Sequence, residues 1–227
     1  MESFSVSVDQ VLYINLDHRT DRMEHMRSIL SESPWPVKRI PGIQFRSAEE
    51  AGGDVGKSVA VLGIWRSHLN ALRRGLDLIR NESLVLLQDD VRIDSGFLRN
   101  GLVLPTTPPD NWEIILLSPR YRARIPIIDS QPDSRKWIRK PFGNKPVRLR
   151  EAYRKYNYIC NGAHFCIFRN MKVIENVVRT MDDTEFKTNF DLFCVLQFKT
   201  FGIHVDEVGT AGFGSDHVKP VSGRPDV

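Results

Sequence analysis

The stretch Val85–Asp94, VLLQDDVRID, is an apolar run that ends in a neutral amide, Gln88, and two adjacent acids, Asp89 and Asp90. An apolar strand that ends in acids can build a metal site, because hard oxygen ligands suit Mn²⁺ or Mg²⁺. Adjacent residues on a continuing strand point to opposite faces, so both acids could reach one ion only if the strand ends at Gln88 and the chain turns. The alternative is a solvated strand end, which the spacing alone favours.

Apolar runs and helical stripes alternate along the rest of the chain. This alternation predicts an α/β fold with a mostly parallel central sheet, helices on both faces, and ligands at the carboxyl ends of the strands. The expected strands are Val11–Leu16, Val37–Ile40, Ser83–Leu87, Ile114–Leu117, Tyr158–Cys160, Ala163–Phe168 and Ile203–Val205. The expected helices begin after an N-cap at Thr20 and at Ser58–Arg80, Ser95–Leu102, Lys172–Thr180 (capped by Asn170) and Asp191–Thr200.

Charge is unevenly spread over the 227 residues, which carry a net +4. Residues 120–155 hold 12 Lys or Arg and three acids, a net +9, so the remainder is about −5. Together with its weak periodicity, this predicts a basic loop or insertion at about 118–156 in a single domain over 1–227, with an irregular tail at about 212–227. Aromatic residues between these cations could bind a sugar or single-stranded nucleic acid, and the lack of a nucleic-acid fold makes the second reading the weaker one.

Several kinds of site and segment are disfavoured because their sequence patterns are missing. The three cysteines show no metal-ligand spacing, and there is no GxGxxG, Walker, HExxH or GxSxG motif. Residues 1–10 lack the basic start and long apolar run of a signal peptide, and no 18-residue apolar stretch exists, so we expect a cytoplasmic protein without a membrane span.

Polar residues near the ends of the expected strands are the first candidates for a binding site. Asn15 and Leu16 end the first strand, and Arg19 and Arg22 open the helix that follows. A guanidinium fork fits phosphate oxygens, so either arginine could bind a phosphate at this edge, although these residues alone favour a surface charge or an ion pair.

Further candidates have structural explanations of their own. His68 flanks an apolar helix stripe as many core-edge histidines do, Ser67 lies on the other side, and His164 within an apolar strand needs a partner. Asp191 fits a capping box with Thr188, and the helix N-terminus would favour the ionised carboxylate that a general base needs.

Taken together, these segments resemble glycosyltransferase family 25, which includes lipooligosaccharide and collagen hydroxylysine galactosyltransferases. The matching segments keep the family order and span most of the chain, and residues 118–156 carry none of them. They are YINLDHRTDR (13–22), GIWRSH (63–68), LVLLQDD (84–90), WEIILL (112–117), GAHFCIF (162–168), FDLF (190–193) and GSD (214–216).

The resemblance implies a GT-A-like nucleotide-diphosphosugar transferase domain that uses Mn²⁺ or Mg²⁺ and inverts the sugar carbon. UDP-galactose is the implied donor, and a glycan or protein hydroxyl is the acceptor. Asp90 with Asp89 would hold the cation and diphosphate, and Asp191 would be the base. The implied donor- or substrate-binding residues are Asn15, Leu16, Arg19, Arg22, Ser67, His68, Asp89, Gly162, His164, Ser215 and Asp216.

Two positions depart from the family pattern. Gln88 stands where the family has an acid, and Phe165 stands where it has a tyrosine. A neutral amide is a weaker ligand for a hard cation. The alternative hypothesis is therefore a protein of the same fold that binds a nucleotide sugar or a partner without transferring sugar.

Overall fold

The structure, a computed structural model, describes residues 3–52, 59–123, 145–155, 158–161, 163–184 and 189–211. Its largest sheet is mixed, with the order β3-β2-β4-β11-β7-β12-β9. The pairs β3–β2, β2–β4 and β7–β12 are parallel, whereas β11 runs antiparallel to both β4 and β7 and β9 runs antiparallel to β12. The strands are β2 (Val8–Asn15), β3 (Val37–Pro41), β4 (Ser83–Gln88), β7 (Ile114–Leu117), β9 (Val147–Arg148), β11 (Phe165–Phe168) and β12 (Thr200–Ile203).

Strand β4 is buried on both faces, which explains its unbroken apolar run. Leu84 and Leu86 pack into the apolar cluster on one face of the sheet, and Val85 and Leu87 pack into the cluster on the other. A strand that is covered on both faces needs apolar residues at every position and not only at alternate ones. The α/β fold predicted from the sequence is confirmed by this arrangement.

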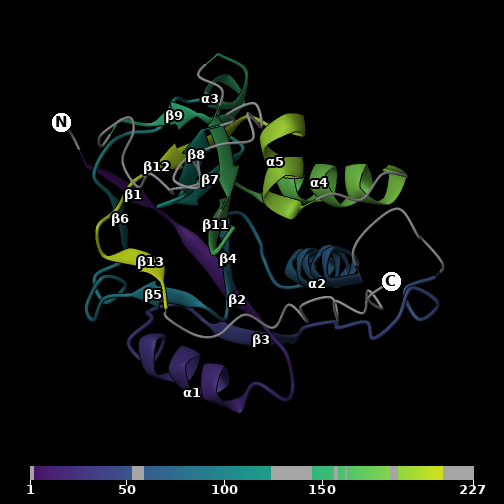
Figure 1. Ribbon diagram of the computed structural model, residues 1–227. Coiled ribbons are helices and arrows are strands. Elements are labelled where there is room, and N and C mark those ends of the chain that lie inside the picture. Colours follow the sequence, from purple (N-terminus) through teal and green to yellow (C-terminus); the bar gives the residue numbers. More distant parts are fainter. Residues whose placement is uncertain are drawn as a thin grey trace, which may run out of the picture.

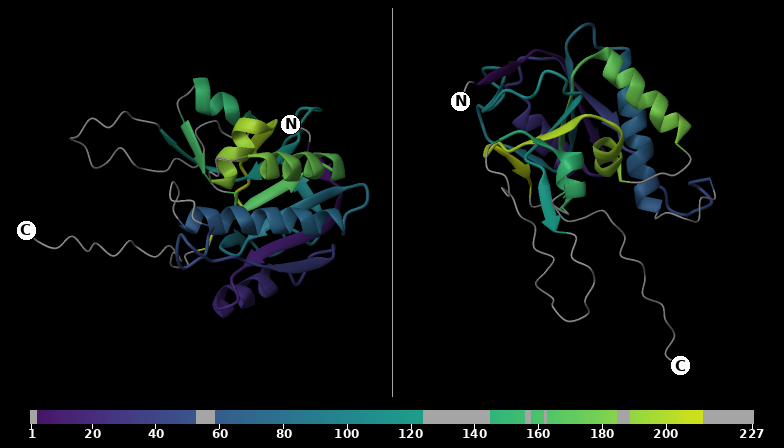
Figure 2. Two further views of the ribbon diagram at one scale, coloured as in Figure 1. Left: turned by 90° about the vertical axis from the view of Figure 1, so that its right-hand side faces the viewer. Right: turned by 90° about the horizontal axis from the view of Figure 1, so that it is seen from above.

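The two faces of the sheet are covered differently. Figure 1 shows α2 (Val59–Leu76), α4 (Met171–Asp183) and α5 (Phe190–Gln197) on the right, and Figure 2 shows them in front of the sheet. The short helix α3 (Leu149–Lys155) contributes to the same apolar cluster. The other face is covered by α1 (Thr20–Ile29) and two small antiparallel sheets, so helices lie on both faces as expected, and on the second face they share the cover with strands. The strands of these sheets are β1 (Phe4–Val6) with β6 (Leu102–Leu104), and β5 (Val91–Ile93) with β13 (Val208–Thr210).

Two expected elements are wrong. Residues 95–100 form turns instead of a helix, because Gly96 and Gly101 have positive φ angles of 85° and 95° that a helix does not accept, and Leu102 then begins β6. The last helix ends at Gln197, and Thr200, which was expected to end that helix, begins β12 beside Ile114. The strand expected at Ile203–Val205 is thus Thr200–Ile203.

The predicted helix caps are corrected in two places. Thr20 is the first residue of α1, and Arg19 is its N-cap, with no side-chain cap bond. The N-cap of α5 is Asn189, and Thr188, which we expected to cap it, lies outside the described residues. The cap at Asn170 is confirmed, because its side chain accepts a hydrogen bond of 3.1 Å from the Val173 amide.

The predicted basic segment at 118–156 contains regular structure in its described parts. Strand β8 (Arg120–Ala123) pairs antiparallel with β10 (Tyr158–Asn161), and β9 and α3 follow near its end. Residues 124–144 and the tail at 212–227 lie outside the described residues, so the boundaries of the segment and of the tail stay predictions.

Candidate functional site

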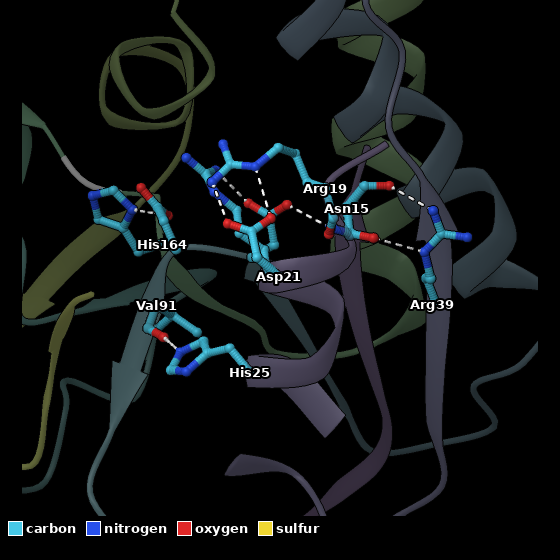
Figure 3. Close-up of polar contacts among 10 residues, drawn as sticks. Asn15, Arg19, Asp21, His25, Arg39, Val91 and His164 are labelled. Carbon is cyan, nitrogen blue, oxygen red and sulfur yellow. Dashed lines mark hydrogen bonds and ion pairs between the residues drawn. The ribbon is translucent and has the colours of Figure 1, made fainter. Parts of the chain in front are cut away.

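The carboxyl ends of β2 and β4 and the start of β11 bring several of the predicted site residues to one edge of the sheet. Asn15 is the last residue of β2, and Asp89 and Asp90 form the turn after β4. His164 precedes β11, and its backbone carbonyl accepts a hydrogen bond of 3.0 Å from the backbone N–H of Gln88 across the strand pair. Figure 3 shows the polar side chains that meet at this edge.

Asp89 is buried and is held by α1 and β2. Its Oδ1 accepts a hydrogen bond of 2.8 Å from Nη1 of Arg22, and its Oδ2 accepts one of 2.8 Å from the amide of Asn15. The side chains of Asp89 and Arg22 are only 10% and 9% exposed. Both carboxylate oxygens are therefore used to fix α1 against the end of the sheet.

Asn15 joins this ion pair to β3 and to the turn before α1. Its amide nitrogen also donates to the Arg19 carbonyl at 3.1 Å, and its side-chain oxygen accepts from Nε of Arg39 at 2.9 Å. Arg39 additionally forms an ion pair with Asp17, and Figure 3 shows Arg39 beside Asn15. A fully buried asparagine with this many partners fixes the path of the chain between β2 and α1.

Asp90 turns in a different direction, toward His164. The Oδ1 of Asp90 lies 2.9 Å from Nδ1 of His164, and Nε2 of His164 lies 3.1 Å from Nη2 of Arg120. Burial acts to raise the pKa of Asp90, but the hydrogen bond from His164 and the charge of Arg22 are among the effects that outweigh it, so this pKa is lowered. Asp90 therefore keeps a negative charge at the edge of the sheet.

Gln88 faces the helical layer and contacts His68. Nδ1 of His68 donates a hydrogen bond of 2.8 Å to the Ile64 carbonyl, which leaves Nε2 as an acceptor 3.4 Å from the Gln88 amide nitrogen. The ring stacks on Phe190 of α5 with centroids 4.1 Å apart. Burial lowers the pKa of His68 to about 4, against the raising effect of its bond to Ile64, so this histidine is neutral at pH 7.

Ser67 is buried and not solvent-facing. Its hydroxyl donates to the Gly63 carbonyl and accepts from the Ile43 amide, both at 2.7 Å. Gly63 is required beside it, because a Cβ there would lie 2.6 Å from the Ile43 carbonyl oxygen. In this structure, the Gly-x-x-x-Ser pattern of the helix seats the loop that follows β3.

Other predicted site residues are less tightly connected to this edge. Arg19 forms an ion pair of 2.8 Å with Asp21, and Leu16 is half-buried in the turn between them and β2. Asp191 is buried in the first turn of α5, where its Oδ1 accepts from the Leu192 amide. The pKa of the Cys166 thiol in β11 is raised mainly by burial and secondly by the negative charge of Asp191.

Three predicted site residues lie outside the described ranges: Gly162, Ser215 and Asp216. Ala211 is the last described residue before Ser215 and Asp216, and its amide donates a hydrogen bond of 2.7 Å to the Asp90 carbonyl.

The divalent cation implied by the resemblance needs several oxygen ligands around one point. Asp89 does not fit, because one of its oxygens accepts from a guanidinium and the other from an amide. The side chain of Gln88 points to His68, and one carboxylate oxygen of Asp90 accepts a hydrogen bond from His164. Across the described residues, no group of three or more His, Cys, Asp or Glu side chains could hold an ion. A cation shared by Asp89 and Asp90 therefore does not fit this arrangement, and a metal role for Asp90 alone stays a prediction.

Sequence reasoning missed two arginines of the site. Arg39 lies within a short strand that has no recognisable motif beside it. Its hydrogen bond to Asn15 depends on the parallel pairing of β2 with β3. Arg120 was visible only as one of many cations in the basic segment. Its contact with His164 depends on the position of β8 at the end of β7, which the sequence pattern does not determine.

No helix in the described ranges combines the length and apolar character that a bilayer crossing requires. No family model matches the chain, and no curated protein matches it. The solved structures that are similar to the chain include two with low TM-scores. One is a glycosyltransferase involved in the glycosylation of the major capsid of PBCV-1, with 9% identity, a TM-score of 0.45, and coverage of 87% of this chain and 82% of that chain. The other is a nucleoside-diphosphate-sugar pyrophosphorylase from Vibrio cholerae RC9, with 11% identity, a TM-score of 0.35, and coverage of 91% and 77%. Both likenesses are too low to assign a function, so the proposals below rest on the residues of the chain itself.

Proposed function

We propose that the chain transfers a sugar, galactose in the first instance, from a UDP-sugar to a hydroxyl of a glycan or protein acceptor. The observation that carries this proposal is the meeting of Asn15, Arg22, Asp89, Asp90 and His164 at one edge of the sheet. These residues come from three separated segments, each of which matches a family motif in order. Ligands of α/β proteins bind at this edge.

The chemistry of such a transfer matches the charges at the edge. The acceptor oxygen bonds to the sugar carbon while the bond from that carbon to the diphosphate oxygen breaks, and its electron pair leaves with UDP. Cationic groups stabilise the negative charge that develops on the diphosphate, and Arg19 and Arg22 are the arginines proposed for this from the sequence. The resemblance also implies Mn²⁺ or Mg²⁺, but the donor set does not fit a shared cation, so no step is assigned to one.

Inversion of the sugar carbon requires a base on the side opposite the diphosphate. Asp191 is the candidate from the resemblance. Its place in the first turn of α5, beside the Phe190 ring that stacks on His68, supports a position on the helical side of the edge. We expect Asp191→Asn to reduce transfer at least 100-fold while UDP binding persists, since general-base catalysis typically contributes a factor of about 10² to 10⁴.

The experiment that tests the function is a donor screen. The chain is incubated with UDP-galactose, UDP-glucose and UDP-N-acetylglucosamine, with Mn²⁺ or with EDTA, and released UDP is measured. We expect one donor to be turned over and UDP to raise the melting temperature. The variant Asp90→Asn should reduce this turnover. Its matched control is Asp182→Asn, which removes an exposed acid from α4. Absence of UDP release with every donor and of stabilisation by UDP would contradict the proposal.

A second candidate function is binding without transfer, which is favoured by the neutral Gln88. Here UDP raises the melting temperature but no donor is turned over. Gln88→Glu discriminates between the two. A large gain of metal-dependent turnover supports a degenerate enzyme, whereas loss of activity indicates that the neutral contact between Gln88 and His68 belongs to the working site.

A further inference from the structure

Arg120, His164 and Asp90 form a chain of hydrogen bonds at the edge of the sheet, with distances of 3.1 and 2.9 Å. A guanidinium can only donate, so Nε2 of His164 must accept from Arg120. The ring proton is then on Nδ1, where it is donated to the carboxylate of Asp90. The geometry therefore selects the neutral tautomer of His164 with its proton on Nδ1.

The neutral ring positions the guanidinium without cancelling its charge. Asp90 fixes the orientation of the His164 ring, and the ring presents its one lone pair to Arg120. The side chain of His164 is only 12% exposed and that of Asp90 is 29% exposed, so the contact between them is largely shielded from solvent. This is how a histidine and an acid orient a third group rather than neutralise it.

The backbone of Arg120 is fixed as well. Ser118, two residues earlier, has a left-handed φ of 47°, and its amide donates to the Ile203 carbonyl at 2.8 Å while its hydroxyl accepts from the Val205 amide at 3.0 Å. Arg120 is then paired with Asn161 in the β8–β10 ladder. An uncommon backbone conformation held by several bonds thus directs the chain from β7 to the position where Arg120 meets His164.

Two further arginines near the edge are held by acids. Arg22 forms an ion pair with Asp89, and both of these side chains are buried. Arg19 forms an ion pair with Asp21, whose side chain is 52% exposed. The acids that a cation would need are engaged by nitrogen donors. The positive charge at this edge is therefore supplied by guanidinium groups, and Arg120 is the one that a neutral histidine positions.

We propose that Arg120, positioned by Asp90 through His164, binds the diphosphate of the nucleotide donor in place of a divalent cation. This inference rests on the proposed function. A guanidinium matches two phosphate oxygens at once, and it would stabilise the electron pair that the diphosphate takes from the breaking sugar–oxygen bond. Asp90 and His164 are positioning residues in this scheme, and Arg120 is the group that touches the donor.

The test compares the binding of UDP and uridine by calorimetry in the presence of EDTA, because only UDP carries the diphosphate. We expect Arg120→Gln to weaken UDP binding roughly 10- to 100-fold, the size of a lost charge-assisted hydrogen-bond pair, and to leave uridine binding unchanged. Arg73→Gln removes one exposed guanidinium from α2 and is the matched control for net charge. Arg120→Lys keeps the charge without the fork and should retain part of the affinity.

The positioning role has its own readout. His164→Gln retains an acceptor for Arg120 and should keep most of the UDP affinity, whereas His164→Leu should lose it while uridine binding stays the same. A purely structural role would weaken both ligands together. Asp90→Asn should lower the UDP affinity in the same selective way, since the ring of His164 loses its charged partner.

The outcomes separate this inference from the proposed function. UDP binding or donor turnover that EDTA abolishes and Mn²⁺ restores would overturn the replacement of the cation while leaving the transferase standing. Equal UDP affinity in wild type and Arg120→Gln would overturn the role of Arg120. Absence of both UDP binding and turnover would sink the proposed function and this inference with it. Metal-independent UDP binding that needs Arg120 but not Arg73 supports the proposal.

Discussion

Removing the carboxylate of Asp89 should destabilise the fold strongly. In Asp89→Ala the guanidinium of Arg22 loses its partner at 2.8 Å, and Asn15 loses one acceptor. Both side chains of the ion pair are about nine-tenths buried. Removing one partner of a buried pair leaves an uncompensated charge and costs about 3–5 kcal/mol. The free energy of unfolding should therefore fall by a large part of the about 5–15 kcal/mol that a typical protein has.

The matched control is the exposed ion pair between Arg73 and Asp182, whose side chains are 52% and 41% exposed. Asp182→Ala should cost only about 0.2–1 kcal/mol, because solvent already screens that pair. A double variant, Arg22→Leu with Asp89→Leu, should recover much of the loss of Asp89→Ala, since it leaves neither charge buried. Urea denaturation followed by circular dichroism measures all four proteins.

Equal losses in the free energy of unfolding for Asp89→Ala and Asp182→Ala would refute the structural role of Asp89. Such a result would mean that Asp89 is not an anchor of α1, and its oxygens would again be candidates for a cation. A strong stabilisation of the wild type by Mn²⁺ that disappears in Asp89→Ala would lead to the same conclusion. Large destabilisation without any effect of Mn²⁺ supports the structural role.

Four further predictions concern the helical layer and the strand beneath it. Ser67→Ala should lower the free energy of unfolding by about 1–3 kcal/mol, because it leaves a buried backbone amide without its acceptor; Gly63→Ala should also destabilise, although alanine normally favours a helix by about 1 kcal/mol, and a stabilised Gly63→Ala would contradict the close contact. The folded-state pKa of His68, about 4, lies below its ordinary 6.5, so only the unfolded chain takes up a proton as the pH falls from 6.5 to 4. Stability should therefore be complete above pH 6.5 and fall by about 3 kcal/mol across this window relative to His68→Gln, and identical pH profiles would count against it. Burial raises the pKa of the thiols of Cys166 and Cys194, so in a Cys160→Ser background neither should react with a thiol reagent until urea unfolds the chain.

The central strands of the main sheet could be predicted from the sequence because they are buried on both faces. The runs Ile114–Leu117 and Leu84–Leu87 are apolar at every position, which distinguishes them from surface strands. Their order could not be predicted in the same way. β11 lies antiparallel between β4 and β7, and this pairing joins residues about 50 to 80 positions apart that carry no shared local signal.

The small sheets were missed for a different reason. β5, β6 and β13 have three residues each, too few to show a period of two. The turn at Gly96 and Gly101 was taken for a helix because the spacing of apolar residues outweighed the two glycines, whose positive φ angles decide the conformation.

Five of the residues that the sequence proposes for the site meet at one edge of the sheet, but their contacts could not be predicted. Ser67 was assigned to the solvent side of its helix, yet the loop at Ile43 covers it and uses both its donor and its acceptor. Helical periodicity places a residue on a face, but it does not show what packs on that face. The same limit applies to Arg120, whose partner lies 44 positions away in the sequence.

The strand end at Gln88, Asp89 and Asp90 shows why adjacent polar residues do not by themselves form one site. Because β4 ends at Gln88 and the chain turns, the three side chains meet three different partners, which are His68, Arg22 and His164. An acid at position 88 would face the lone pair of a neutral, buried histidine, and it would either repel Nε2 or force a proton onto a ring that its surroundings keep uncharged. The amide avoids this conflict because its nitrogen can donate to Nε2. A neutral amide at position 88 is thus consistent with the neutral His68, and the charge at the edge comes from Asp90 and the arginines around it.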